Sequence, residues 1–248
     1  MSSNISNPVI EIKALRKSYG ENFVLNGFNM KLFEGENLVI MGKSGCGKSV
    51  MIKCLIGLEE PDGGTIMVMG KNINDLKRED LDELRTEIGF LFQGSALYDS
   101  MSVRENLEFP LRRHTKKFGF LKDTTPLVLE ALENVGLAHA INLMPNELSG
   151  GMKRRIALAR TLILQPKIIL YDEPTTGLDP ITSKEIILLM MSIQKKYNTS
   201  SIIITHDVDC ARVISNRMIL LVDGINYKEG TFEELSVSSD PKVRAFFK

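Results

Sequence analysis

The stretch Gly42-Lys43-Ser44-Gly45-Cys46-Gly47-Lys48-Ser49 matches the pattern GxxxxGK[ST], in which a loop between a strand and a helix holds phosphate groups. Its glycines let the backbone curl so that N–H groups point at phosphate oxygens, and the following helix adds the positive end of its dipole. Lys48 would supply a mobile positive charge to the β- and γ-phosphates, and the Ser49 hydroxyl can bind Mg²⁺. The alternative is a glycine-rich turn that matches by chance, which the flanking residues disfavour.

The residues around this loop predict an α/β fold. Residues 37–41 form an apolar run that ends at the loop, and residues 46–58 have the pattern of a helix. Residues 168–171 and 201–205 are apolar runs without alternation, which is typical of strands buried on both faces of a parallel sheet. Three segments near the N-terminus alternate as half-buried strands do, and we expect them to form an antiparallel β-subdomain: 9–12, 28–32 and 65–69.

The later part of the chain alternates helices with these buried strands. Two segments have apolar residues at helical spacing: 126–136 and 152–163. Thr182 and Glu185 match a capping box, which would begin a helix that runs through Tyr197. We expect a single domain over residues 9–248 with a mostly parallel core sheet, and a helical subdomain inserted at approximately residues 95–165.

Two acidic residues are predicted to complete the phosphate site. Asp172 and Glu173 directly follow the apolar run 168–171. A carboxylate at the end of such a strand can lie near Mg²⁺, and a second one beside it can orient a water molecule that attacks the γ-phosphate. Acidic turns at strand ends are common, so this prediction depends on the loop that precedes it.

Composition excludes some classes of function. The chain has 248 residues with 31 basic and 31 acidic side chains, and this zero net charge argues against a nucleic-acid-binding protein. Three cysteines without a CxxC pair fit a reducing compartment. The N-terminus lacks the pattern of a signal peptide, and apolar runs such as Met218–Val222 are too short to cross a bilayer. If the protein acts at a membrane, we expect another chain to span it.

The segment Leu148-Ser149-Gly150-Gly151-Met152 stands between the loop and the strand that ends at Asp172. Ser149 and two glycines at a helix N-terminus can form a second anion site. In this order, the segment resembles the signature motif of ABC-type ATPases, and the resemblance covers nearly the whole chain. It implies a P-loop NTPase fold of ABC type with ATP and Mg²⁺ as cofactors.

The resemblance also implies roles for single residues. Tyr19 matches the aromatic residue that stacks on adenine, although it could be an ordinary tyrosine at a strand end. Gln93 matches the glutamine that joins the core to the helical subdomain and senses Mg²⁺ and water. The segment Gly177–Asp179 matches the loop that communicates across a dimer, and His206 matches the switch histidine that contacts the γ-phosphate, where a lone histidine is usually structural.

ABC-type ATPases work in pairs, so the resemblance implies a homodimer. Two copies would face each other head to tail, with each ATP between Lys48 of one copy and the Ser149–Gly151 turn of the other. ATP binding would close the pair and hydrolysis would reopen it. The expected partner is an integral membrane permease, which places the protein peripherally on the cytoplasmic face of the inner membrane.

Residues 94–115 carry a more specific resemblance. The segment contains Ala-Leu-Tyr-Asp-Ser at 96–100 and Phe-Pro-Leu-Arg-Arg-His-Thr at 109–115. It is similar to ATPases of the Mla type, which maintain lipid asymmetry with MCE-domain partners and have G-A-L-F-D-S followed by V-x-x-N-V-A-F-P-L-R-E-H-T. Tyr98 replaces Phe, Leu107-Glu108 replaces Val-Ala, and Arg113 replaces Glu. The chain ends soon after Phe247, so we expect no long C-terminal tail that clasps the sister subunit.

Several alternatives remain open at this level. The chain could serve another ABC importer or a lipoprotein-releasing exporter, and the substrate and transport direction are not encoded in the shared motifs. A soluble ABC ATPase acting on DNA or ribosomes is disfavoured by the zero net charge. A catalytically inactive binding module is disfavoured by the intact site residues. A basic run formed by Arg112, Arg113, Lys116 and Lys117 could lie near anionic lipid or could be a solvated helix end.

Overall fold

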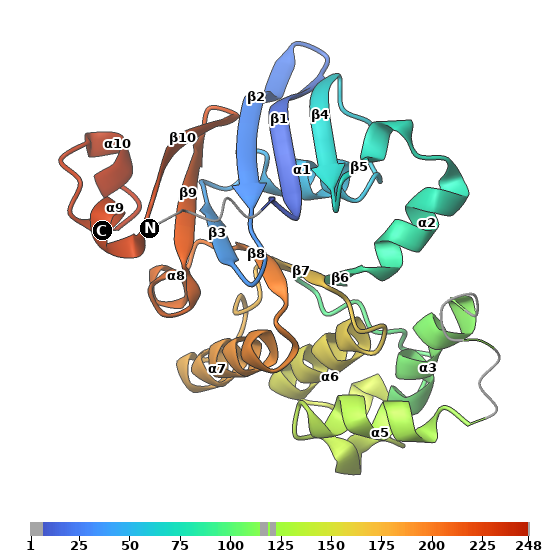
Figure 1. Cartoon of the computed structure of the whole chain (residues 1–248). Helices are drawn as coiled ribbons and strands as arrows, with labels where there is room; N and C mark the ends of the chain where they lie inside the picture. The colour runs from blue at the N-terminus through green and yellow to red at the C-terminus, as the bar shows by residue number, and fades with distance from the viewer. Residues whose placement is uncertain (1–6, 115–118, 120–122, 248) are drawn as a thin grey trace, which may run out of the picture.

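The computed structural model describes residues 7–114, 119 and 123–247, which fold around two β-sheets (Figure 1). The N-terminal sheet is antiparallel and has the order β2-β1-β4-β5. Its strands are β1 (Ile10–Tyr19), β2 (Asn22–Leu32), β4 (Gly63–Val68) and β5 (Lys71–Asn72). This sheet confirms the predicted antiparallel β-subdomain.

The core sheet has six strands in the order β10-β9-β3-β8-β7-β6. Its members are β3 (Asn37–Met41), β6 (Ile88–Leu91), β7 (Ile168–Asp172), β8 (Ser200–Ile204), β9 (Arg217–Val222) and β10 (Ile225–Gly230). All neighbours in it pair in parallel except β10, which is antiparallel to β9. The mostly parallel core sheet expected from the sequence is therefore confirmed.

The core sheet is buried on both faces because its strands separate two hydrophobic clusters. In β3, Val39 and Met41 belong to one cluster, whereas Leu38 and Ile40 belong to the other. All four side chains are almost fully buried. This explains why the strands lack the polar–apolar alternation of a half-exposed sheet.

Helices cover both faces of this sheet (Figure 1). Buried residues of α1 (Lys48–Leu55) pack in the cluster that also contains the N-terminal sheet. The other face is covered by α6 and α7, and Figure 1 shows α3 and α5 beyond α6. The remaining helices and their bounds are α2 (Arg78–Thr86), α3 (Val103–Arg113), α5 (Thr125–Glu133), α6 (Gly150–Leu162), α7 (Pro180–Tyr197), α8 (Val208–Ile214), α9 (Phe232–Ser236) and α10 (Pro241–Arg244), with short 3₁₀ turns at Ile73–Asp75, Ala138–Ala140 and Pro145–Glu147.

One cluster joins α3, α5 and α6 to the underside of the core sheet. Because α6 packs against α3, α5 and also β6, it belongs to the helical part and to the core at once. The proposed subdomain limits of 95–165 therefore remain a prediction. Thr115, Lys116 and Lys117, which close the resembling segment and the basic run, lie outside the described residues. In the part of the chain that is described, no helix is both long and apolar enough to span a bilayer.

The start of α7 differs from the expected capping box. The helix begins at Pro180, and Asp179 is its N-cap, because its Oδ1 accepts hydrogen bonds from the backbone N–H of Ile181 and of Thr182 at 3.0 Å. Thr182 instead donates its hydroxyl to Asp179 Oδ2 at 2.5 Å, and Glu185 pairs with Arg155 on α6. The prediction was wrong by one turn, since a proline at the first helical position with aspartate before it is an equally good start.

Candidate functional site

Most of the predicted site residues lie at the ends of four neighbouring strands of the core sheet. The glycine loop follows β3, and His206 follows β8. Asp172 ends β7 and Glu173 comes directly after it, while Gln93 follows β6. Because these strands are parallel, their carboxyl ends meet at one edge of the sheet, where ligands bind in open α/β folds. There the structure has a cavity of about 660 Å³. Its lining includes Gly42, Lys43, Ser44, Gly45, Gly47, Lys48, Ser49, Gln93, Asp172, Glu173 and His206.

The loop needs glycine at specific positions. Gly45 and Gly47 have φ angles of +77° and +105°, which side-chain-bearing residues rarely adopt. A Cβ at Gly47 would lie 2.8 Å from the carbonyl oxygen of Val24, and one at Gly42 would lie 2.4 Å from Cys46 Sγ. The conformation of Gly47 also delays the start of α1 to Lys48, two residues later than expected.

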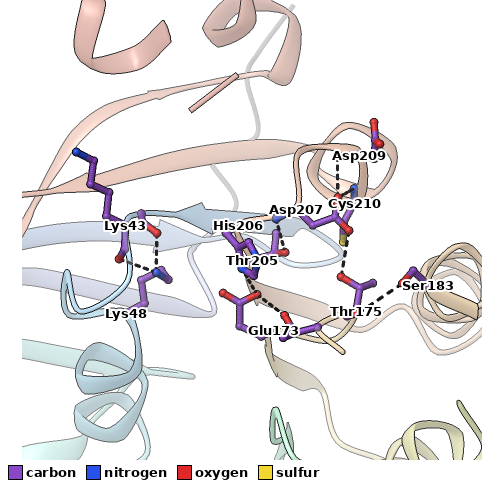
Figure 2. A network of polar contacts seen from close by, with 12 residues as sticks. Lys43, Lys48, Glu173, Thr175, Ser183, Thr205, His206, Asp207, Asp209 and Cys210 are labelled. Atoms are coloured by element: carbon purple, nitrogen blue, oxygen red, sulfur yellow. Dashed lines mark hydrogen bonds and ion pairs between the residues drawn. The ribbon is translucent and has the colours of Figure 1, made fainter. Parts of the chain in front are cut away.

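Lys48 is the buried cation among the residues that line this cavity and is 9% exposed, whereas Lys43 is exposed. Its Nζ donates hydrogen bonds to the carbonyl oxygens of Gly42 at 2.7 Å and Lys43 at 3.0 Å (Figure 2). The ammonium group is thus held over the loop by neutral acceptors, and its charge remains available to an anion in the cavity.

The two carboxylates at the end of β7 have different surroundings. Burial raises the pKa of Asp172, the nearby charge of Glu173 raises it further, and Lys48 opposes this shift. Glu173 has a φ of 50°, an uncommon backbone conformation for a non-glycine residue, and its N–H donates to Ile204 O at 2.9 Å. This turn directs the Glu173 side chain toward His206, with 2.8 Å between Oε2 and Nδ1 (Figure 2).

Further residues at the site were not predicted from the sequence. Thr176 donates its hydroxyl to Glu173 Oε2 at 3.0 Å, and Thr175 donates to Asp207 Oδ2 at 3.1 Å, which ties the end of β7 to the segment after β8. Ala245 and Phe246 also line the cavity. Threonines in the turn after Glu173 gave a weak signal, whereas nothing in the sequence relates the last residues of the chain to the loop.

Other predicted residues do not line this cavity. Tyr19 is 47% exposed, with the Lys17 ammonium 5.4 Å from its ring centroid. Ser149 is exposed and is the N-cap of α6, because its hydroxyl accepts a hydrogen bond from Met152 N–H at 3.2 Å. Gly150 and Gly151 follow it at the start of that helix. Cys46 is part of the loop, but its side chain does not line the cavity; its Sγ lies 3.9 Å from Lys48 Nζ.

The donor set fits a nucleotide with Mg²⁺. The Ser49 hydroxyl and the Asp172 carboxylate are hard oxygen ligands of the kind that Mg²⁺ prefers. The raised pKa of Asp172 means that its negative charge is poorly solvated, and a bound cation would compensate that charge. Lys48 and the glycine loop supply the positive charge and the curled backbone that phosphates need.

Comparisons with known proteins agree with this geometry. Residues 25–176 match the sequence model of the ABC transporter family. The Intermembrane phospholipid transport system ATP-binding protein MlaF of Haemophilus influenzae is 39% identical over 240 residues, which cover 97% of this chain and 90% of the relative. The Probable ribonucleotide transport ATP-binding protein mkl of Mycobacterium leprae is 40% identical over 237 residues, 96% of this chain and 68% of the relative.

Two further proteins complete the comparison. The Methionine import ATP-binding protein MetN of Campylobacter jejuni is 37% identical over 252 residues, 96% of this chain and 75% of the relative. Among solved structures, a dimeric ATP-binding cassette in a post-hydrolysis state with ADP and Pi superposes with a TM-score of 0.81 at 34% identity. That match covers 90% of this chain and 98% of the other.

The chain therefore belongs to the ABC transporter family as one of its ATP-binding domains. It is an ATPase with ATP and Mg²⁺ as cofactors, and ATPases of this family function as dimers with a membrane permease.

Proposed function

We propose that this ATPase powers phospholipid transport between membranes through an Mla-type permease and an MCE-domain protein, from the cytoplasmic face of the inner membrane. The observation that carries the proposal is the segment after Gln93, which contains the residues that resemble Mla-type ATPases and also lines part of an apolar groove on the surface. The 39% identity to a phospholipid transport ATPase, over 90% of that protein's length, supports it.

The groove has a volume of about 490 Å³ and lies beside the Gln93 loop. Tyr98 and Phe109 are 43% and 37% exposed, and their ring centroids are 4.9 Å apart. The guanidinium of Arg160 lies 5.8 Å from the Tyr98 ring and donates to the carbonyl oxygens of Ser95 and Ala96. Exposed aromatic side chains around a concave surface suit the docking of an apolar helix from a permease.

The groove is held in a fixed shape. Asn106 is fully buried, accepts a hydrogen bond from Tyr98 N–H at 2.8 Å, and donates to the carbonyl oxygens of Tyr98, Met101 and Ser102. Tyr98 therefore sits on a rigid turn. We infer that a permease helix seated against Tyr98 would act directly on the loop that begins at Gln93.

The site residues have distinct roles in this proposal. Lys48 and the loop Gly42–Ser49 bind the phosphates, and bound Mg²⁺ offsets their charge. Ser49 and Asp172 would hold the metal ion, and Gln93, which lines the same cavity, would sense it. Glu173 orients the attacking water, and its contacts with Thr176 and His206 fix the direction of its carboxylate before ATP binds.

The remaining predicted residues act on the outside of the cavity. Tyr19 stacks on adenine, and Ser149, Gly150 and Gly151 cover the ATP bound by the opposite subunit. The absence of Ser149, Gly150 and Gly151 from the lining of the cavity in a single chain agrees with a site that is completed by a second copy, as in a head-to-tail homodimer. No nucleic acid is involved in this proposal.

The second candidate is an ATPase for the import of a small molecule. Relatives at 40% and 37% identity are named for ribonucleotide transport and methionine import, so the family motifs alone do not select the lipid. The residues after Gln93 favour the first candidate, because they carry the resemblance to Mla-type ATPases.

The first test compares the parent protein with Glu173→Gln, each with and without membranes that contain its cognate permease. We expect the variant to bind ATP, to remain dimeric with ATP and to lose turnover, because the carboxamide cannot orient water as a carboxylate does. The parent should be stimulated by the permease, and the complex purified from membranes should contain an MCE-domain protein and phospholipid.

Two results would contradict the proposal in separate ways. A variant that hydrolyses ATP as fast as the parent removes Glu173 from its role. Copurification of only amino-acid or metal-ion transport subunits removes phospholipid as the substrate and leaves the ATPase intact.

A further inference from the structure

Arg154 on α6 makes contacts that set it apart from its neighbours. Its Nη1 donates to the carbonyl oxygen of Phe92 at 2.8 Å, and its Nη2 donates to the carbonyl oxygen of Thr176 at 3.3 Å. Phe92 directly precedes Gln93, and Thr176 lies three residues after Glu173. One guanidinium therefore joins the loop after β6 to the loop after β7, and both to the helix that begins at Ser149.

This arginine is buried without a counter-charge. It is 4% exposed, its Nε has no hydrogen-bond partner, and among the described residues it forms no ion pair within 4.0 Å. Burial lowers the pKa of Arg154, with no carboxylate to oppose the shift. A buried cation without a counter-charge lowers the free energy of unfolding. A residue chosen for stability alone would therefore be apolar here.

The adjacent residue shows the ordinary alternative. Arg155 pairs with Glu185 on α7 at 2.6 Å and donates to Val135 O at 3.4 Å, which are contacts that hold helices together. The hydrogen bonds of Arg154 do not connect α6 to another helix. Its two acceptors are backbone oxygens of the loops that carry predicted site residues.

The contacts of Arg154 continue to the reacting region. Thr176, whose carbonyl accepts from Arg154, donates its hydroxyl to Glu173 Oε2, and the same oxygen contacts His206 Nδ1. A shift of α6 would therefore move the Glu173 loop and the Gln93 loop together. The planar fork of arginine suits this bridge, because two parallel donors fix both distance and orientation.

We propose that Arg154 is a positioning residue for ATP hydrolysis, which holds the Gln93 and Glu173 loops in register with the helix that covers the partner's ATP. This inference rests on the proposed roles of Gln93 and Glu173. The Arg154 side chain acts on the rate of hydrolysis and leaves ATP binding to the glycine loop, from whose cavity it is absent.

The test compares Arg154→Met with Arg155→Met, which removes an arginine from the same helix at the next position. Methionine fills a similar volume without the two donors. We expect Arg154→Met to lower kcat by on the order of 10- to 100-fold, the cost of misplacing reacting groups by about 1 Å. The Kd for MgATP should stay within about twofold, and Arg155→Met should keep the parent kcat. Binding is measured with a fluorescent ATP analogue.

A second variant distinguishes the effect of the two hydrogen bonds of Arg154 from the effect of its positive charge. Arg154→Lys keeps the positive charge but offers a single point of donation, so we expect its kcat to remain low. It also replaces Arg154→Met if that variant does not fold. ATP-dependent dimerisation of the double variant Arg154→Lys with Glu173→Gln should equal that of Glu173→Gln alone. A parent-like kcat for Arg154→Lys, or a Kd for MgATP that rises in step with the loss of kcat, would overturn the proposal.

Failure of the inference differs from failure of the proposed function. If Glu173→Gln is inactive and a folded Arg154 variant is fully active, Arg154 is not a positioning residue and the role of Glu173 stands. If Glu173→Gln is active, the proposed mechanism fails whatever the Arg154 variants do.

Discussion

Asp172 has a partly buried carboxylate at the end of β7, and burial followed by the charge of Glu173 raises its pKa. A carboxyl whose pKa is raised in the folded state lowers the free energy of unfolding wherever it is ionised. This cost is fully present above the raised pKa, declines as the pH falls through it, and disappears below the ordinary value of 3.8.

We therefore expect Asp172→Asn to be more stable than the parent at pH 7 in the absence of nucleotide. Urea unfolding of both proteins at pH 7 and pH 4 should show a difference that narrows at the lower pH. Hydrolysis should fall by on the order of 100-fold or more, since a metal ligand is lost and metal-based stabilisation contributes several kcal/mol. Lower stability of the variant at pH 7 would show that the carboxylate is held by favourable contacts.

Single residues also show where sequence reasoning ends. The loop Gly42–Ser49 and the pair Asp172-Glu173 were visible because their chemistry depends on side chains at fixed spacing. Arg154 and Thr176 were not, because their function here depends on backbone carbonyl oxygens or on a hydroxyl 3.0 Å from Glu173. Every residue has a carbonyl, so such contacts leave no pattern in the sequence.

At the level of elements, α6 and α7 approach closely at one glycine. A Cβ at Gly151 would lie 2.7 Å from Thr182 Cγ2, whereas one at Gly150 would meet nothing nearer than Leu178 Cδ2 at 3.8 Å. Thr182 cannot easily turn away, because its hydroxyl is bonded to Asp179. The second glycine of the segment is thus required by helix packing, independently of any phosphate.

We expect Gly151→Ala to lower the free energy of unfolding by about 1–3 kcal/mol through overpacking. Gly150→Ala should be neutral or stabilising by up to about 1 kcal/mol, since alanine favours the helix. Chemical denaturation of both variants measures the difference. Equal stability would mean that α7 moves aside at little cost, and that packing does not explain Gly151.

The elements differed in how well the sequence predicted them. Runs such as 168–171 identified buried strands because parallel strands are apolar on both faces. The start of α7 was misplaced because Asp179 and Thr182 are both good caps, and only the hydrogen bonds of Asp179 distinguish them. The positive φ of Glu173 could not be predicted either, since glutamate has no preference for that conformation.

At the scale of the whole molecule, the Lys48 and the Ser149 of one chain belong to different ATP sites if two copies meet head to tail. In a symmetric pair each site would combine the loop of one copy with the α6 N-terminus of the other. Lys48→Ala damages one half of a site. Ser149→Asp damages the other half, because it keeps the helix cap but places a negative charge against the phosphates.

We expect each of these variants alone to be inactive and an equimolar mixture to recover about a quarter of the parent activity. Random pairing makes half of the dimers mixed, and each mixed dimer has one intact site of two. Single-turnover ATP hydrolysis measures this recovery. A mixture no more active than the better single variant would mean that Lys48 and Ser149 of the same chain serve the same site, which contradicts the head-to-tail arrangement.

The position of β3 in the core sheet has a consequence for the protein while it is being made. The strand that leads into the glycine loop pairs with β8 and β9, so that Met41 lies opposite Leu220. At about 5 to 20 residues per second, the ribosome needs roughly 8 to 35 seconds to complete the partners of β3 after the loop has been made. During that time β3 lacks both of its strand partners, and the nascent chain displays an apolar strand. Capture of ATP is thus among the last properties the chain acquires, and the exposed β3 segment is where a chaperone would be needed.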